Sequence, residues 1–200
     1  GLDDDGNGLV DDLHGFDFAY NDGVPDAIHP HGVNTGGIIA ANTNNANQIA
    51  GIASGVTILP LKAFDNGGFF PCCGPYAGEL SAAAAIAYAV EQGATIISNS
   101  WTNGTSPSAV INAAIADAVA QGVHLVFAAG NNGTQLGWPG QHPEVTGVAA
   151  IDSLGHRSNW GFQSSTYGTW VEVSAAGTGV ATTTTFGGTI PDFAGTSAAC

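Results

Sequence analysis

The chain has 200 residues and carries sixteen carboxylates against two cationic side chains, so its formal net charge is −14. This excess of negative charge argues strongly against nucleic acid as a partner. No run approaches the ~20 apolar residues of a membrane span, and 44% hydrophobic residues indicate a globular chain. The length suits a single domain with a sizeable core. We expect a monomer in an extracellular setting, where cations can offset the clustered carboxylates.

The first segment of the chain is acidic and has oxygen-bearing side chains at alternate positions. These are Asp3, Asp5, Asn7 and Asp11. With Gly8 at the sharp turn, the spacing follows the first nine positions of a calcium loop, whose alternate residues converge on one hard cation. His14 stands where the loop usually has a bidentate glutamate, and Asp12 is the candidate substitute. The pattern favours a structural calcium ion, and a solvated acidic turn is the alternative.

A helix rich in glycine and alanine is predicted at residues 31–41, after a loop-like stretch at residues 14–30. His31 lies in its first turn, where a histidine is more often structural than catalytic. Such a helix can approach another backbone closely, as a helix that forms a site must. The asparagine-rich loop at residues 42–48 is either a second calcium site or a plain surface turn.

Strands and helices then alternate along the chain. The predicted elements are a strand at Val56–Phe64, a helix at Leu80–Gln92 ended by Gly93, a strand at Ala94–Ser100, a helix at Ser106–Gln121 ended by Gly122, and strands at Val123–Ala129, Val145–Ala150 and Trp170–Val173. A run of threonines, Thr182–Thr185, follows them. Near-continuous apolar strands are typical of a parallel sheet covered on both faces. The predicted fold class is therefore α/β, a three-layer αβα arrangement around a mainly parallel central sheet. Ligands of such sheets bind at the carboxyl ends of the strands, where Trp101 and Asn131 are expected.

The last stretch, Gly195-Thr196-Ser197, places a serine at the start of an alanine-rich helix. Free N–H groups and the positive end of the helix dipole lie there, where negative charge develops during attack on a carbonyl. The position suits a nucleophile, and a simple helix cap is the alternative. Asn131 can donate its side-chain N–H to the resulting oxyanion. An asparagine in a left-handed turn is the alternative there.

Three motifs in this order, His31-Gly32, Ala129-Gly130-Asn131 and Gly195-Thr196-Ser197, resemble those of the subtilisin-like serine proteases, the subtilases. The resemblance runs from about residue 3 to residue 200. Further segments are also similar to family motifs: Ile52-Ala53 through Leu59-Pro60-Leu61-Lys62, Ile96 through Trp101, Pro139, and Glu172 through Gly177. The acidic segment is similar to an insertion that some members carry, and Pro139 matches a proline that is usually cis in the family.

The resemblance implies an endopeptidase that works through an acyl-enzyme. Ser197 would attack the peptide carbonyl, while His31 would take its proton and return it to the leaving amine. Asn131 and the backbone N–H of Ser197 would bind the tetrahedral oxyanion. The substrate groove would be lined by Ser100, Trp101 and Thr102, which pair with the peptide backbone. The pocket for the side chain before the cut would be floored by Ala128, Ala129 and Gly130.

The chain departs from the family pattern at several positions. Asn34 replaces the second histidine of the motif around His31, Thr102 replaces a glycine and narrows the groove, and Ala176 replaces a proline. The family carries its triad aspartate before the histidine in an Asp-Thr-Gly motif, and no aspartate here is followed by Thr-Gly. We therefore expect residues 1–200 to form one incomplete catalytic domain, without the first strand, which bears the aspartate, and without the C-terminal helices.

On this interpretation the isolated chain has little or no activity, and its intact parent is a secreted endopeptidase that acts on polypeptides. The main alternative is a catalytically inactive subtilisin-like binding or structural domain that has lost its aspartate. The presence of His31, Asn131 and Ser197 together favours the enzyme, because a relaxed site has no physical need for all three. A calcium-loop adhesion module would leave the serine site unexplained. A sedolisin-like enzyme, with a Glu/Asp/Ser set, would have no role for His31.

Overall fold

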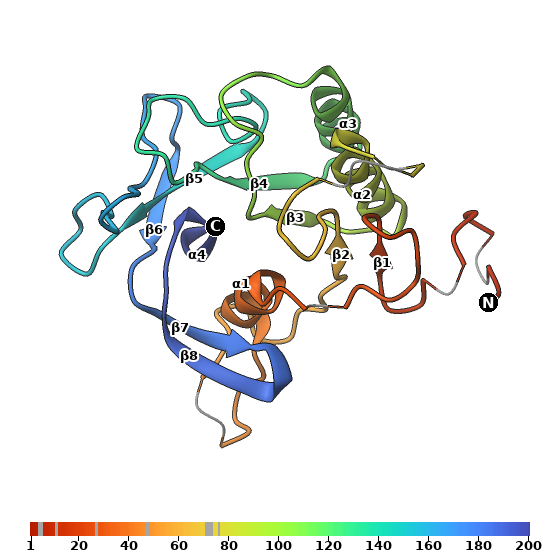
Figure 1. Cartoon of the computed structure of the whole chain (residues 1–200), viewed down its shortest axis with the longest axis horizontal. Coiled ribbons are helices and arrows are strands. Elements are labelled where there is room, and N and C mark those ends of the chain that lie inside the picture. Colours follow the sequence, from red (N-terminus) through yellow and green to blue (C-terminus); the bar gives the residue numbers. More distant parts are fainter. Residues whose placement is uncertain (4–5, 11, 27, 47–48, 71–73, 76) are drawn as a thin grey trace.

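A computed structural model describes residues 1–3, 6–10, 12–26, 28–46, 49–70, 74–75 and 77–200 (Figure 1). Its elements are, in chain order, β1 (Phe16–Asp17), α1 (His31–Ala40), β2 (Leu61–Lys62), α2 (Glu79–Glu91), β3 (Ile96–Asn99), α3 (Ala109–Ala120), β4 (His124–Ala128), β5 (Thr146–Ile151), β6 (Val173–Ala176), β7 (Val180–Thr184), a 3₁₀ turn (Thr185–Gly187), β8 (Gly188–Phe193) and α4 (Thr196–Ala199). None of the helices in these ranges has the length and apolar character that crossing a lipid bilayer requires.

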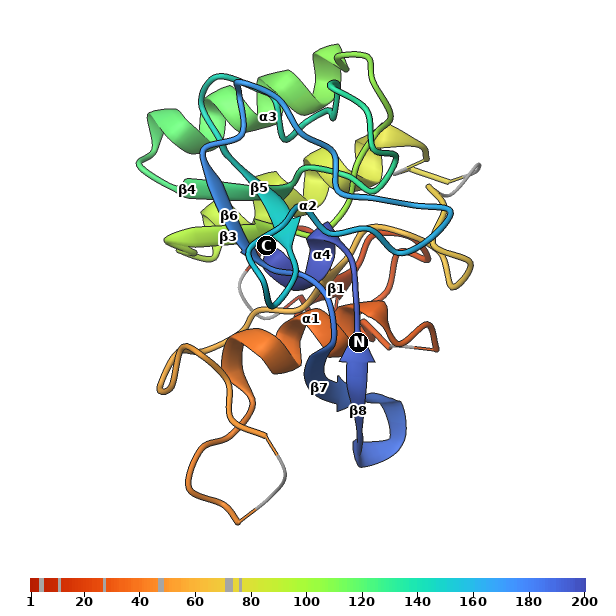
Figure 2. The ribbon, with the colours of Figure 1, turned by 90° about the vertical axis from the view of Figure 1, so that its left-hand side faces the viewer.

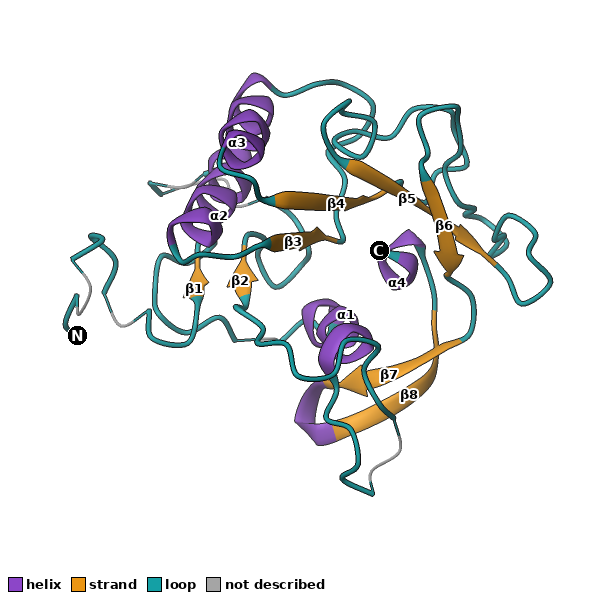
Figure 3. Ribbon diagram, turned by 180° about the vertical axis from the view of Figure 1, so that it is seen from behind, coloured by secondary structure: helices purple, strands orange, loops and turns teal. Residues whose placement is uncertain are grey.

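The central sheet contains four strands in the order β3-β4-β5-β6, and every neighbouring pair is parallel (Figure 3). Asn99 lies opposite Phe127, and Ala128 lies opposite Val148. The chain therefore leaves β3 and β4 at the same edge of the sheet, beside one another. The α/β class and the mainly parallel sheet predicted from the apolar strands are confirmed.

Helices cover both faces of this sheet (Figure 2). On one side α2 and α3 pack together and α3 packs on β4. The core between them contains Ile86, Ile111, Ile115, Leu125 and Phe127, each at most 2% exposed. On the other side α4 packs on β5 and β6, and α1 contacts α4. Each such buried side chain contributes about 1.5–3 kcal/mol, so the strands are held firmly where their ends approach α4.

Local signals in the sequence account for the ends of the two long helices. Gly93 and Gly122 follow α2 and α3 with φ of +77° and +81°, the left-handed conformation that glycine adopts without strain. Ser108 caps the start of α3, where its side chain accepts the N–H of Ile111. The backbone of Ser108 is extended, so α3 begins at Ala109 rather than at the predicted Ser106.

Several strands differ from their predicted limits. The predicted strand at Val56–Phe64 is reduced to β2, which pairs in parallel with β1, a strand that lies inside the predicted loop at residues 14–30. The predicted strand at Trp170–Val173 begins only at Val173, as β6. The threonine run forms β7, and it pairs with the unpredicted antiparallel strand β8. β8 contains glycine, proline and aspartate, which are poor strand formers, so its neighbours rather than its own residues hold it extended.

A buried ion pair fastens β1 to β2. Asp17 is 1% exposed, accepts the N–H groups of Ala19 and Tyr20, and lies 2.7 Å from Lys62 Nζ. Lys62 also donates to Asp26 at 3.0 Å. Burial alone would lower the pKa of Lys62, but the hydrogen bonds to the two aspartates outweigh it and raise that pKa. Lys62 therefore stays charged, and the pair anchors the segment that leads to α1.

Close packing fixes α1 against β7. A Cβ on Gly37 would come within 2.1 Å of Thr183 Oγ1 and 2.7 Å of Thr182 Oγ1, so a larger residue cannot fit there. The hydroxyls of Thr182 and Thr183 donate to two carbonyls of α1 at 2.5 and 2.9 Å. The close approach expected from the small residues of α1 is present. It sets the helix that begins with His31 beside the hairpin that leads to Ser197.

Candidate active site

Ser197 lies in the first turn of α4, directly beside the end of β3. Gly195 precedes the helix with φ +130°, a conformation that side-chain-bearing residues rarely adopt. The Ser197 hydroxyl donates to the Ser100 carbonyl at 3.1 Å, and the Ser100 hydroxyl donates to the Ser197 carbonyl at 3.2 Å. This reciprocal pair holds the serine at the carboxyl edge of the parallel sheet.

Asn131 follows β4, and its side-chain amide is held in one orientation by Thr196. The Thr196 N–H and hydroxyl both approach Asn131 Oδ1 at 2.9 Å. An N–H can only donate, so the oxygen of the amide faces Thr196 and the N–H₂ group faces elsewhere. The N–H of Gly130 donates to the Thr196 hydroxyl at 3.0 Å. The sequence motifs therefore converge into one preorganised donor next to the serine.

His31 is the first residue of α1, and its ring packs edge-on against Phe193, with ring centroids 5.9 Å apart. Because α1 contacts α4, the structure brings the histidine and serine helices together. Within the described ranges no hydrogen bond joins the side chains of His31 and Ser197, and no carboxylate contacts the imidazole. The serine hydroxyl is instead turned toward Ser100, and no residue that the structure describes hydrogen-bonds the imidazole so as to fix its tautomer.

Asn34 stands at one of the positions where the chain departs from the subtilase pattern. It is 4% exposed, and with its amide nitrogen directed inward it donates to the carbonyls of Pro30 and Thr183 at 3.1 and 2.8 Å. The substitution leaves a satisfied polar link between α1 and β7 in the interior.

The structure lowers the pKa of His31 below its ordinary value of 6.5, first through burial and then through the positive charge of His29 nearby. We expect His29→Gln to raise this pKa, because it removes a like charge, while burial still holds it below 6.5. NMR titration of the His31 ring in the isolated chain measures the change. His156→Gln, at an exposed site, is the control and should leave it unchanged.

A general base must be unprotonated to accept a proton, so the change in the His31 pKa predicts the direction in which the pH dependence of a reaction would move. If His31 is the general base of the complete protein, the rate should fall as the pH falls through the pKa of His31, and His29→Gln should move that acid limb to higher pH. A pKa of His31 that does not respond to His29→Gln would contradict the charge contact.

The other predicted groove residues lie along two neighbouring segments. Ser100 and Thr102 are half-buried, while Ala128, Ala129 and Gly130 are buried at the end of β4. The Trp101 ring, however, packs into the core, 5.2 Å from the ring of Phe127 and 5.7 Å from that of Phe64. Its indole N–H donates to Asn99. The Trp101 side chain is therefore held mainly by core residues.

The acidic segment is organised by its own hydrogen bonds. The two oxygens of Asp3 accept the N–H groups of Gly6 and Gly8 at 2.8 and 2.9 Å. Asn7 donates to Asp12 at 2.8 Å, and the Tyr88 hydroxyl also donates to Asp12 at 2.8 Å. No group of three acidic, histidine or cysteine side chains suited to a metal was found among the residues that are described. Two predicted ligands, Asp5 and Asp11, lie outside those residues.

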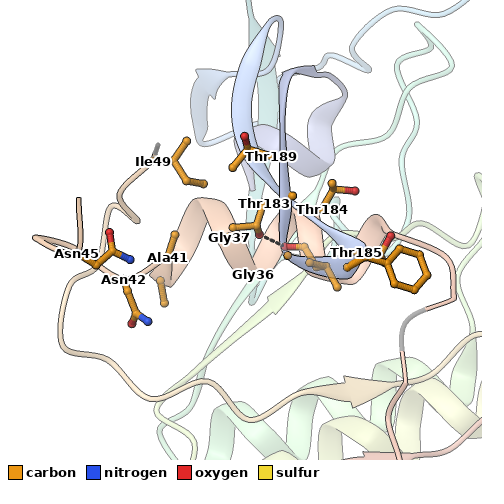
Figure 4. Close-up of a pocket in the computed structure, with 15 residues that line it drawn as sticks. Gly36, Gly37, Ala41, Asn42, Asn45, Ile49, Thr183, Thr184, Thr185 and Thr189 are labelled. Atoms are coloured by element: carbon orange, nitrogen blue, oxygen red, sulfur yellow. Dashed lines mark hydrogen bonds between the residues drawn. The ribbon is translucent and has the colours of Figure 1, made fainter. Parts of the chain in front are cut away.

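A cavity of about 660 Å³ lies between α1 and the β7–β8 hairpin (Figure 4). Its lining includes Gly36, Gly37, Asn42, Thr183, Thr184 and Phe186, but neither His31 nor Ser197. The cavity is therefore separate from the serine site.

Sequence reasoning did not single out Thr196 or Phe193. Thr196 lies inside the Gly-Thr-Ser motif, so its motif position was the one available signal. Phe193 carries no signal, because its contact with His31 arises where β8 passes the start of α1. The peptide between Trp138 and Pro139 is cis, as the resemblance implied.

Comparisons with known proteins agree with this geometry. The model of the subtilase family matches residues 2–200. The thermophilic serine proteinase of Bacillus sp. (strain AK1) is 36% identical over 175 residues, 86% of this chain and 40% of that protein. Thermitase of Thermoactinomyces vulgaris is 36% identical over 171 residues, 84% of this chain and 57% of that protein. The chain thus spans about half the length of these relatives.

Solved structures show the same fold. A cold-adapted subtilisin-like serine proteinase superposes with a TM-score of 0.78 at 22% identity, covering 92% of this chain and 62% of that one. A prenylagaramide maturation protease superposes with a TM-score of 0.66 at 26% identity, covering 85% of this chain and 59% of that one. The family model, the relatives and the arrangement of the site lead to one conclusion: the chain belongs to the subtilase family of serine peptidases.

Proposed function

We propose that the complete protein is a serine endopeptidase that cleaves polypeptides through an acyl-enzyme. The observation that carries this proposal is the Asn131 amide, which Thr196 orients beside the hydroxyl of Ser197. A nucleophile next to a fixed N–H donor is the minimum arrangement for acyl transfer. The relatives named as serine proteinases support it.

The reaction follows from the groups in place. Ser197 Oγ turns from the Ser100 carbonyl, attacks the peptide carbonyl and passes its proton to His31. Asn131 Nδ2 and the Ser197 N–H stabilise the oxyanion, and His31 then protonates the leaving amine. Water attacks the acyl-enzyme by the same route in reverse. The backbone of residues 100–102 pairs with the substrate as an added strand.

The triad acid comes, on this proposal, from a strand upstream that completes residues 1–200 as one domain. β3 pairs with β4 along one edge, and its other edge pairs with no strand of the described ranges. A parallel strand added there would end beside Ser100 and near α1. The lack of a carboxylate against His31 in the described residues also supports a second candidate, a catalytically inactive subtilisin-like binding domain.

Asn131→Asp separates these candidates. The aspartate keeps the oxygen that accepts from Thr196 but loses the donor to the oxyanion. We expect kcat of the complete protein on a fluorogenic peptide to fall about 10²–10³-fold. Asn132→Asp, at the exposed neighbouring position, adds the same charge and is the control. Unchanged activity of Asn131→Asp would remove Asn131 from the catalytic machinery, and an inactive wild type would favour the binding domain.

We also propose that the acidic segment binds a structural calcium ion. The described donors fit, because Asp3, Asn7 and Asp12 offer the hard oxygens that calcium prefers, and the turn between them already joins Asn7 to Asp12. Asp5 and Asp11, which lie outside the described residues, would complete the set. The ion would neutralise charge in a chain of net charge −14 and would take no part in peptide cleavage. This cation requirement is consistent with secretion of a monomeric enzyme into a calcium-containing medium.

Calcium should therefore stabilise the protein. An ion at about 100 times its Kd adds about 2.7 kcal/mol, which for a domain of this size raises Tm by about 5–10 °C. Thermal unfolding of the complete protein with calcium or with a chelator measures this. Asp12→Asn should reduce the response, and Asp192→Asn, exposed on β8, should not. A Tm that does not depend on calcium would leave the segment a solvated turn.

A further inference from the structure

Two neighbouring segments lie beside Ser197, and we call the space between them the slot. The chain leaves β3 through residues 100–102 and leaves β4 through residues 128–130, and the two strands are parallel neighbours. Ser197 Oγ lies 3.1 Å from the Ser100 carbonyl, and Asn131 directly follows the second segment. On the proposed function, the side chain of the residue before the scissile bond lies between these two segments.

Hydrogen bonds hold both segments that border the slot in place. On one side the Gly130 N–H donates to Thr196 Oγ1 at 3.0 Å, and the Gly130 carbonyl accepts the Thr166 N–H at 2.8 Å. On the other side the Asn103 N–H donates to the Trp138 carbonyl at 2.7 Å, and the Trp138 N–H donates to the Gly104 carbonyl at 3.0 Å. Widening the slot would break these hydrogen bonds, so its width is a fixed property of the fold.

Thr102 occupies the space between the walls. A Cβ built on Gly130 would already lie 3.4 Å from the methyl carbon of Thr102 and 3.2 Å from the hydroxyl of Thr166. Thr166 is 1% exposed and belongs to the interior, whereas Thr102 is half-buried and borders the groove. A single methyl group at Gly130 thus reaches van der Waals contact with the opposite wall, and the atom it meets is the Thr102 methyl.

The base of the slot, formed by residues 129 and 137, is also closely packed. A Cβ on Gly137 would lie 2.0 Å from the Ala129 carbonyl oxygen and 3.1 Å from the Thr166 methyl, so the backbones of residues 129 and 137 are in direct contact. The Trp101 ring cannot swing aside to make room, because it packs against Phe64, Phe70 and Phe127 in the core. Thr102 is the one movable boundary that a single substitution can remove.

We propose that Thr102 restricts the residue before the scissile bond to small side chains, those of glycine, alanine and serine. The inference rests on the proposed peptidase function and adds its substrate class. A phenylalanine or leucine would have to overlap the Thr102 methyl or break the hydrogen bonds that Trp138 makes with Asn103 and Gly104. Overpacking of this kind separates otherwise similar ligands by about tenfold or more.

The test compares two p-nitroanilide peptides that differ only in alanine or phenylalanine before the scissile bond. The complete protein should cleave the alanine peptide with a kcat/KM about tenfold or more above that of the phenylalanine peptide. Thr102→Gly should lower this ratio about tenfold. Thr102→Ser removes only the methyl and should lower it partly, whereas Thr102→Val keeps a methyl and should retain the ratio. Thr105→Gly, exposed outside the slot, is the matched control.

A binding measurement keeps this inference separate from the proposed reaction. In the complete protein with Ser197→Ala, calorimetry with the two product peptides, which end in alanine or phenylalanine, should show the same preference and the same response to Thr102→Gly. Absence of cleavage with this binding preference would defeat the proposed function alone. Equal or tighter binding of the phenylalanine peptide, no binding of either peptide, or a preference that Thr102→Gly does not change would overturn the role of Thr102.

Discussion

Replacing Ser197 by alanine in the complete protein is expected to lower kcat for a peptide substrate about 10⁶-fold, the cost of removing the nucleophile from a serine-protease triad. The reason lies in the neighbouring hydroxyls. Thr196 Oγ1 is occupied by Gly130 and Asn131, and Ser100 Oγ donates to a backbone carbonyl. Neither can replace Ser197 as the attacking group.

The measurement is hydrolysis of a fluorogenic peptide under saturating substrate, with circular dichroism to show that the variant is folded. Ser153→Ala, on an exposed turn, is the control and should retain wild-type kcat. Ser197→Ala leaves the hydrogen bonds that Asn131 Oδ1 accepts from Thr196 in place, so KM should change little. A variant that retained more than about 1% of the activity would show that the reaction does not use this serine.

The central layers could be predicted because each strand there carries its own signal. β4 and β5 are apolar after their first residues, His124 and Thr146, and α2 and α3 end at glycines in the left-handed conformation, so local sequence and final structure agree. β1, β2 and β8 could not be predicted as well. β1 is two residues long and depends on the ion pair between Asp17 and Lys62, and β8 depends on its pairing with β7. Tertiary contacts override weak propensity at such places.

Some features of the candidate site could also be predicted from the sequence, and others could not. Ser197 and Asn131 could be identified because their chemistry demands particular neighbours at the ends of predicted elements. The link between them, through Thr196, could not, because it depends on the bend that brings α4 over β4. The sequence also could not predict that the Trp101 ring packs into the core. Side chains alternate between the two faces only along a paired strand, and the last paired residue of β3 is Asn99. Periodic sequence patterns predict helices and strands, but they do not predict side-chain contacts between loops.

The isolated chain is expected to hydrolyse peptides about 10⁴-fold more slowly than the complete protein, because His31 has no carboxylate among the described residues to fix its tautomer and stabilise its charged form. The same loss is expected in the complete protein when the upstream aspartate that we propose is replaced by asparagine. Peptide hydrolysis by matched concentrations of the two forms measures the difference. Strong activity of the isolated chain would contradict it.

A second readout reports on the imidazole itself. Burial and His29 lower the pKa of His31 in the chain, and a carboxylate against the ring would raise it, because a neighbouring negative charge favours the protonated form. With Ser197→Ala in both forms to prevent self-cleavage, the His31 pKa should therefore be higher in the complete protein than in the chain. A pKa equal in the two forms, together with absent activity, would mean that no acid reaches His31. The inactive binding domain would then be the better account of why His31, Asn131 and Ser197 remain side by side.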